Sequence, residues 1–315
     1  MKSRLLTVLA VAIAAVAVLF AGARFFSAPG PPPPAHARLP AIPASYLGVW
    51  EGGAPPSATS IADFTQAAGH PPNRVGYFSG WAERFQASYA TSVRRRGMVP
   101  FVQIDPSFAS VAGIAAGAYD GYLRSYADSV RAYGDGVVIG FGHEMNAPWY
   151  SWGYGHVAPA TFVAAWQHIV TLFRGQGADN VTWLWTINAD VPGTGPIAEW
   201  WPGAGYVNWI GIDGFYYTPS DTFTTVFAKT IDEVRVFAHK PILLSETAVG
   251  PKAGQFLGIN DMFRGMRQFQ TLGLVWFDVR QNDGVHHQDW RIEDSGLAAH
   301  AALKLGVSGL HLSHT

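Results

Sequence analysis

Residues 137–153, VVIGFGHEMNAPWYSWG, indicate both the fold and the chemistry of this chain. The segment begins with a continuous apolar run, residues 137–141, which is typical of a strand covered on both faces. His143 and Glu144 follow where that strand ends, and three large aromatic residues follow Glu144 within eight positions. Burying an unpaired carboxylate is costly, so this setting favours a functional site over core packing. Because aromatic faces stack on sugar rings and carboxylates transfer protons, we predict the floor of a carbohydrate active site here.

Outward from this stretch, apolar runs alternate with amphipathic stretches, the rhythm of a parallel βα sheet. Eight strands are expected at residues 46–50, 74–78, 98–104, 137–142, 181–187, 209–215, 241–245 and 274–277. Helices are expected at residues 84–96, 117–133, 160–173, 222–237 and 256–271, with Gly97, Gly134, Gly177 and Gly273 at their ends. Eight βα units in roughly 260 residues predict an α/β fold, a (β/α)8 TIM barrel, which typically has about 250 residues. The main competitor is an open doubly wound sheet, but no G-x-G-x-x-G follows the first strand.

The N-terminus is predicted to direct export. Lys2 and Arg4 precede an uncharged, mostly apolar run at residues 5–23, and residues 21–23 resemble a small-x-small cleavage site. Residues 1–24 are therefore either a cleaved signal peptide or a membrane anchor. Residues 25–44 are a proline-rich linker, and residues 45–315 form a single catalytic domain. We expect an extracellular or cell-surface protein.

Composition excludes several classes of protein. The 315 residues carry a formal charge of -1, which disfavours nucleic acid as a partner. The absence of cysteine excludes disulfides and thiolate metal sites. His286 and His287 lie near two aspartates, but their spacing fits no zinc motif. We expect no cofactor, no metal and a monomer.

Glu246, at the end of the seventh expected strand, is the second candidate carboxylate. Glycoside hydrolysis needs one carboxylic acid to protonate the leaving oxygen and a second carboxylate as nucleophile or base. Strand alternation groups Glu144 with Val138 and Glu246 with Leu244, so both glutamates are expected to point into the barrel mouth. Two like charges so close cannot both ionise cheaply, so one pKa is expected to rise and supply the acid. Asp213, at the end of the sixth strand, is either a ligand to sugar hydroxyls or an acceptor for backbone amides.

Five motifs together resemble glycoside hydrolase family 26, the β-mannanase family of retaining (β/α)8 enzymes. They are GHEMN (142–146) with WYSWG (149–153), WIGIDGF (209–215), SET (245–247), VWFD (275–278) and DWRI (289–292). The resemblance runs from about Tyr46 to Leu305, with the motifs in the family's order.

The resemblance implies a role for each matching residue. Glu144 is expected to be the acid/base and Glu246 the nucleophile. His143 is expected to orient the sugar or the nucleophile. The other residues expected to bind substrate are Asn146, Trp149, Trp152, Asp213, Tyr216 and Trp276, with Trp276 as the aromatic floor beneath the scissile sugar.

Four residues depart from the family pattern. Gly140 stands where an arginine is expected, Ala147 where a glycine is expected, and Asp105 where many relatives have an aromatic residue. Phe215 replaces a tyrosine that hydrogen-bonds the nucleophile, and Tyr216 could compensate only if the strand end bulges. These departures concern the choice of substrate more than the class of reaction.

The predicted function is an exported retaining endo-glycosidase acting on β-linked polysaccharide, β-1,4-mannan first. Mixed-linkage β-1,3-1,4-glucan and β-1,3-xylan are alternative substrates, and trimming of the cell's own exopolysaccharide is a third possibility. A different class of protein also stays open: a non-catalytic carbohydrate-binding protein on a degenerate hydrolase barrel.

Overall fold

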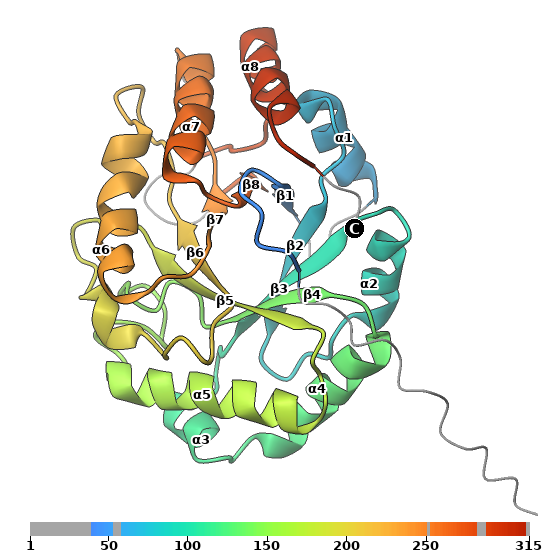
Figure 1. Cartoon of the computed structure of the whole chain (residues 1–315), viewed down its shortest axis with the longest axis vertical. Helices are drawn as coiled ribbons and strands as arrows, with labels where there is room; N and C mark the ends of the chain where they lie inside the picture. The colour runs from blue at the N-terminus through green and yellow to red at the C-terminus, as the bar shows by residue number, and fades with distance from the viewer. Residues whose placement is uncertain (1–38, 53–57, 251–252, 282–287, 313–315) are drawn as a thin grey trace, which may run out of the picture. The chain divides into compact units, whose positions relative to one another are not determined.

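Eight parallel strands pair in sequence order and close into a barrel, which confirms the predicted (β/α)8 fold (Figure 1). The computed structural model describes residues 39–52, 58–250, 253–281 and 288–312. The strands are β1 (Tyr46–Glu51), β2 (Arg74–Gly80), β3 (Val99–Asp105), β4 (Val137–Phe141), β5 (Val181–Asn188), β6 (Trp209–Asp213), β7 (Ile242–Thr247) and β8 (Gly273–Asp278).

Helices surround the barrel on its outside (Figure 1). They are α1 (Ala58–Ala68), α2 (Ala87–Arg94), α3 (Val111–Ala115), α4 (Asp120–Tyr133), α5 (Pro159–Gly175), α6 (Lys229–Phe237), α7 (Gln255–Phe269) and α8 (Leu297–Ser308). A 3₁₀ turn, η1 (Ile197–Trp200), precedes β6, and a π-helical turn, η2 (Thr224–Ala228), leads into α6. Gly134 ends α4 with a φ of 81°, as its position in the sequence predicted.

The predicted signal or anchor (1–24) and most of the predicted linker (25–44) lie outside the described residues, as do His286 and His287. Among the residues that are described, no helix has the length and apolar character needed to cross a bilayer.

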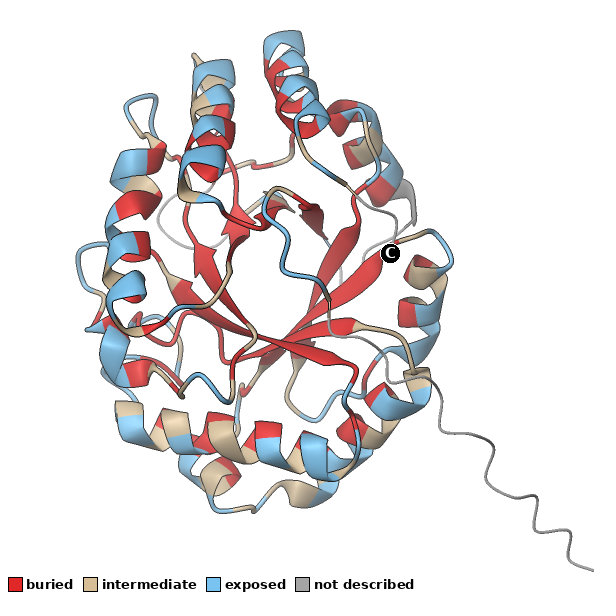
Figure 2. Cartoon of the chain, in the orientation of Figure 1, coloured by how far each residue is buried: buried red, intermediate tan, exposed pale blue. Residues whose placement is uncertain are grey.

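Buried side chains form two layers, one between strands and helices and one inside the barrel. Figure 2 shows strands buried along their length and helices buried mainly on the side facing the barrel. The inner layer consists of Tyr46, Trp50, Phe101, Val138, Leu184, Trp209, Leu243, Leu272 and Val275. Trp50 fits because Gly76 has no side chain: a Cβ there would lie 2.5 Å from the indole ring. The barrel is therefore a packed core, and ligands can reach it only at its mouth.

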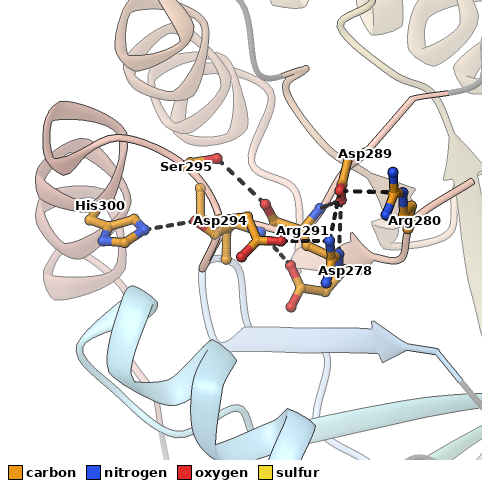
Figure 3. Close-up of polar contacts among 8 residues, drawn as sticks. Asp278, Arg280, Asp289, Arg291, Asp294, Ser295 and His300 are labelled. Atoms are coloured by element: carbon orange, nitrogen blue, oxygen red, sulfur yellow. Dashed lines mark hydrogen bonds and ion pairs between the residues drawn. The ribbon is translucent and has the colours of Figure 1, made fainter.

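Polar contacts fasten the segment after β8 to the barrel (Figure 3). The backbone amide of Ile292 donates to Oδ1 of Asp278 at 2.7 Å. Arg291 Nη2 lies 2.7 Å from Oδ2 of Asp289, and Nε2 of His300, on α8, lies 2.7 Å from the carbonyl oxygen of Ile292. These contacts hold residues 288–295 beside the end of β8.

Candidate active site

Two left-handed backbone positions bring Glu144 out of strand β4. Gly142 has a φ of 54° and Glu144 a φ of 53°, a region that non-glycine residues rarely adopt. A side chain at Gly142 would also come within 2.8 Å of Phe162 on α5. The amide of Glu144 donates to the carbonyl of Thr186 on β5 at 3.0 Å, which fixes the turn. Strained backbone of this kind is often found at functional sites.

Two donors hold the carboxylate of Glu144. Trp149 Nε1 donates to Oε2 at 2.6 Å, and Asn188 Nδ2 donates to Oε1 at 2.8 Å. Asn146 in turn holds Asn188: its side chain donates to the Asn188 carbonyl and accepts from the Asn188 amide, both at 2.9 Å. Both oxygens of Glu144 are thus fixed in place.

A β-bulge in β7 gives Glu246 its direction. Leu243 lies in the inner layer of the core and Leu244 in the outer layer, so regular alternation would point Glu246 outward. The register shifts between Leu244 and Thr247, and Asp213 of β6 pairs with Glu246 instead of Ser245. The alternation predicted for β7 was therefore wrong, because a bulge re-aims the side chains that follow it.

The bulge is supported from inside the barrel. Trp50 Nε1 donates to the carbonyl of Ser245 at 2.7 Å, and the hydroxyl of Ser245 donates to Oδ1 of Asp213 at 2.5 Å. A buried carbonyl released from the ladder would otherwise lack a partner, at a cost of about 1–3 kcal/mol.

Glu144 and Glu246 are close enough for the charge of one to act on the other. Asn188, Asp213 and Glu246 are register partners on three neighbouring strands, so about 10 Å separates the backbones of Asn188 and Glu246. The carboxylate of Glu144 accepts a hydrogen bond from the Asn188 side chain and so lies close to Asn188. Both residues are buried, with 7% of the surface of Glu144 and 6% of that of Glu246 exposed.

A raised pKa was expected at one of the two glutamates, and it is found at Glu246, the predicted nucleophile, and also at Asp213. Burial, followed by the charges of Asp213, Glu144 and Asp105, holds the pKa of Glu246 well above its usual range. Burial and the charge of Glu144 do the same for Asp213. Oε1 of Glu246 and Oδ2 of Asp213 have no hydrogen-bond partner. Both groups are therefore harder to ionise than a carboxyl group in water.

A hydrogen-bonded chain runs from β3 to the loop after β4. His143 Nδ1 lies 2.9 Å from Oδ1 of Asp105, and its Nε2 lies 3.1 Å from the hydroxyl of Tyr150. Burial alone would lower the pKa of His143, but Asp105 and the charges of Glu144 and Asp213 raise it to about 9. The imidazole is therefore protonated at neutral pH.

The structure corrects the predicted substrate contacts of three residues. Asn146 is fully buried, and its amide is committed to the backbone of Asn188. Trp152 is 4% exposed and donates Nε1 to the carbonyl of His143 at 2.9 Å. Asp213 is fully buried, and its Oδ1 accepts a hydrogen bond from the hydroxyl of Ser245, as expected for a structural acceptor. The polar groups of Asn146 and Trp152 thus bond to the protein backbone and support the site from beneath.

Tyr216 and Trp276 are corrected as well. Tyr216 is buried, and its hydroxyl lies 3.4 Å from Asp261 on α7, so it does not compensate for the hydroxyl missing at Phe215. Trp276 belongs to the outer layer and donates Nε1 to the carbonyl of Trp290 at 3.0 Å. A completely buried indole offers no face to a sugar.

Trp149 has the exposure that a sugar platform needs. It is 49% exposed beside the acidic oxygen that its own Nε1 contacts. His143 is 2% exposed, which fits an orienting role better than direct contact with sugar. The space at Gly140 is filled by Gln103, whose Oε1 would lie 1.9 Å from an added Cβ, so an arginine has no room there.

Sequence analysis assigned no role to three residues that support the site: Tyr150, Asn188 and Trp50. Asn188 ends β5 and Trp50 lies one residue before the end of β1. Polar or aromatic residues at the carboxyl ends of barrel strands are a signal that could have found both. Tyr150 is part of the decisive stretch, but nothing in the sequence says that its ring lies against Trp152.

Comparison with known proteins finds relatives of the catalytic domain. A family model described as "Glycosyl hydrolase family 26" matches residues 120–295. "Endoglucanase H" of Acetivibrio thermocellus is 29% identical over 266 residues, covering 79% of this chain and 29% of that protein. "Beta-1,3-xylanase TXYA" of a Vibrio species is 23% identical over 234 residues, covering 69% of this chain and 49% of that protein. The chain thus spans less than half the length of either relative.

Solved structures share the barrel. Bacillus subtilis mannanase BCman superposes with a TM-score of 0.60 at 18% identity, over 82% of this chain and 84% of that one. An endo-β-1,4-mannanase of Bacillus sp. JAMB-750 superposes with a TM-score of 0.64 at 13% identity, over 85% and 87%. At these identities the likeness shows the fold alone. The family match, however, covers more than half of the residues, and on that ground the chain belongs to glycosyl hydrolase family 26.

Proposed function

We propose that the barrel is a retaining endo-glycosidase acting on β-linked polysaccharide, with Glu246 as nucleophile and Glu144 as acid/base. The observation that carries this proposal is the pair itself. Two carboxylates, one following β4 and one at the end of β7, lie at the carboxyl ends of the strands, and the charge of Glu144 contributes to the raised pKa of Glu246. Retaining glycoside hydrolysis needs two such carboxylates, one as nucleophile and one as acid/base.

Each residue has a step in the reaction. An oxygen of Glu246 bonds to the anomeric carbon while the glycosidic C–O bond breaks and Glu144 gives its proton to the leaving oxygen. Glu144 then takes a proton from water, whose oxygen bonds to the anomeric carbon as the ester to Glu246 breaks. Trp149 and Asn188 hold Glu144 through both steps and stabilise the carboxylate left after its proton has gone.

Nucleophilic attack needs an ionised Glu246. In the resting site, burial and neighbouring charges keep its pKa high. The productive form therefore has the proton of the pair on Glu144, and interacting carboxyl groups of this kind titrate as a unit.

A gluco-configured β-glucan with mixed linkages is the first candidate substrate. The two sequence relatives are named for glucan and xylan hydrolysis, and both of those sugars have an equatorial 2-hydroxyl. β-1,4-Mannan, whose 2-hydroxyl is axial, is the second candidate, supported by the family motifs. The half-exposed Trp149 suits stacking on either sugar ring.

Export is part of the proposal. The apolar run at residues 5–23 and the proline-rich segment after it support a catalytic domain presented outside the cytoplasm, either released or held at the membrane. Outside the cytoplasm, the catalytic domain would have access to a polysaccharide that is too large to enter the cell.

The test is a substrate panel for the full chain: mixed-linkage β-glucan, β-1,4-mannan and β-1,3-xylan, assayed by reducing ends. The double variant E144A/E246A is the blank. We expect kcat/KM on β-glucan to exceed that on mannan by about 100-fold or more, because a site built to bind one hydroxyl strongly disfavours its epimer. Faster cleavage of mannan would reverse the order of the two substrates. Binding to a polysaccharide without product release would favour a carbohydrate-binding protein instead.

A further inference from the structure

Phe108, in the loop after β3, is fully exposed and has a φ of 67°. That left-handed region favours glycine and asparagine, and a bulky side chain there is a backbone outlier. Five non-glycine residues in the described part of the chain have a left-handed φ, and Phe108 is the only bulky apolar one among them. Single exposed apolar residues are ordinary, but here packing compensates neither the exposed ring nor the strained backbone. Strain that persists in this way points to a function.

Hydrogen bonds hold the turn that carries Phe108. The amide of Ala109 donates to the carbonyl of Pro106 at 3.1 Å, which closes a four-residue turn with Phe108 at its third position. The next amide, that of Ser110, donates to the hydroxyl oxygen of Tyr119 at 3.2 Å. The turn therefore presents the ring in a fixed place. A surface that is ordered before binding loses little conformational entropy when a ligand stacks on it.

This turn lies at the carboxyl end of the barrel strands, where the two glutamates lie. Phe108 follows Asp105, the last residue of β3, by three positions, so their Cα atoms are at most about 11 Å apart. Oδ1 of Asp105 lies 2.9 Å from Nδ1 of His143, the residue before Glu144. β3 and β4 are paired neighbours in the barrel. Phe108 therefore belongs to the rim of the site that holds Glu144.

Exposed aromatic side chains gather on this part of the rim. Within the described ranges they are Phe108, Trp149, Tyr154 and Phe256, and the first three belong to the loops after β3 and β4. Trp149 donates Nε1 to Oε2 of Glu144 at 2.6 Å, so its half-exposed ring lies beside the predicted acid/base. Phe108 has no polar group, so it offers a ligand only the face of its ring. A sugar unit has an apolar C–H face that such a ring can cover.

We propose that Phe108 forms a distal sugar-binding subsite, where its ring stacks on a unit of the β-linked polysaccharide away from the bond that is cleaved. The inference rests on the proposed function for the identity of the ligand. Trp149 already lies against Glu144, so the ring on the neighbouring loop serves a unit farther along the chain. Phe108 binds substrate and transition state equally, so its loss raises KM and leaves kcat unchanged.

The first test is Phe108→Ala, assayed on the polysaccharide and on a short aryl glycoside. We expect KM for the polysaccharide to rise about tenfold with kcat unchanged, because apolar contact area is lost from ground state and transition state alike. The aryl glycoside does not reach the subsite, so its kcat/KM should not change. Val236→Ala is the matched control: Val236, on α6, is 83% exposed, and its replacement should alter none of these constants.

Binding without cleavage gives a second measurement. In a Glu246→Ala background, affinity electrophoresis through gels that contain β-glucan or β-1,4-mannan reports polymer binding, and adding Phe108→Ala should weaken it about tenfold. Phe108→Gly should weaken binding to the same extent. Its melting temperature should stay at or above that of the wild type, because glycine adopts a left-handed φ without strain. A lower melting temperature would mean that the ring packs against protein, and would overturn the inference.

The remaining outcomes separate this inference from the proposed function. An active wild type whose KM for polysaccharide is unchanged by Phe108→Ala overturns the subsite alone. A wild type that cleaves no polysaccharide, but binds one through Phe108, contradicts the proposed function and keeps the subsite. Self-association in sedimentation that Phe108→Ala abolishes, with polymer binding unchanged, would assign the ring to a contact between two copies and overturn the inference.

Discussion

Glu246→Ala is expected to lower kcat on the true polysaccharide by at least about 10⁴-fold, a large part of the 10⁶-fold or greater acceleration that enzymes supply. The variant loses the atom that forms the covalent bond, and no other carboxylate can take its place. Asp213, the neighbouring acid, is fully buried and holds the hydroxyl of Ser245. The measurement is the initial rate of reducing-end release, in an assay that detects rates about four orders of magnitude below the wild-type rate.

The same variant should fold at least as stably as the wild type. Oε1 of Glu246 has no hydrogen-bond partner, and burial holds the group's pKa high, so its removal relieves a desolvation cost. Glu51→Ala is the matched control, because Glu51 is also a buried glutamate at a strand end with an unpartnered Oε1. That control should keep full activity. Turnover retained by Glu246→Ala would contradict the assignment of the nucleophile.

Glu144→Ala is expected to show a loss that depends on the leaving group. General acid catalysis contributes about 10²- to 10⁴-fold, and it matters most when the departing oxygen is a poor leaving group. Polysaccharide cleavage should therefore fall by about that factor. Cleavage of an aryl glycoside with an acidic phenol should lose far less in its first step, because a phenolate departs without a proton.

A pre-steady-state burst distinguishes this outcome from a general loss of the site. With the acid/base absent, the glycosyl-enzyme forms from the aryl substrate but is hydrolysed slowly, so one equivalent of phenol should be released rapidly. Equal losses on both substrates, without a burst, would mean that Glu144 does not transfer the proton.

The strands were predictable because barrel strands are covered on both faces and read as continuous apolar runs. All eight strands begin within one residue of the predicted position; the segment predicted at residues 98–104, for example, is Val99–Asp105. Because both faces of each strand are covered and apolar, the sequence does not show which residues face the inside of the barrel. Trp276 and Phe277 are equally apolar, yet Trp276 packs outward and Phe277 lies at the edge of the inner layer.

The site was predictable as a set of residue types and less so as a set of contacts. Glu144 and Glu246 stand at strand ends, which the apolar runs located. The bulge in β7 could not be predicted from the sequence. It is supported by a hydrogen bond from the indole of Trp50, almost 200 residues away, to the carbonyl of Ser245. For the same reason Trp152 could not be told from Trp149: only the fold shows which indole is covered by Tyr150.

The anomeric configuration of the first product tests the pairing of Glu144 and Glu246 most directly. Proton NMR during early hydrolysis of mixed-linkage β-glucan, before mutarotation, reports it. Two successive displacements at the anomeric carbon, the first by Glu246 and the second by water activated by Glu144, predict that the β-anomer appears first. An α-anomer as the first product would mean a single displacement by water, and would contradict Glu246 as the nucleophile.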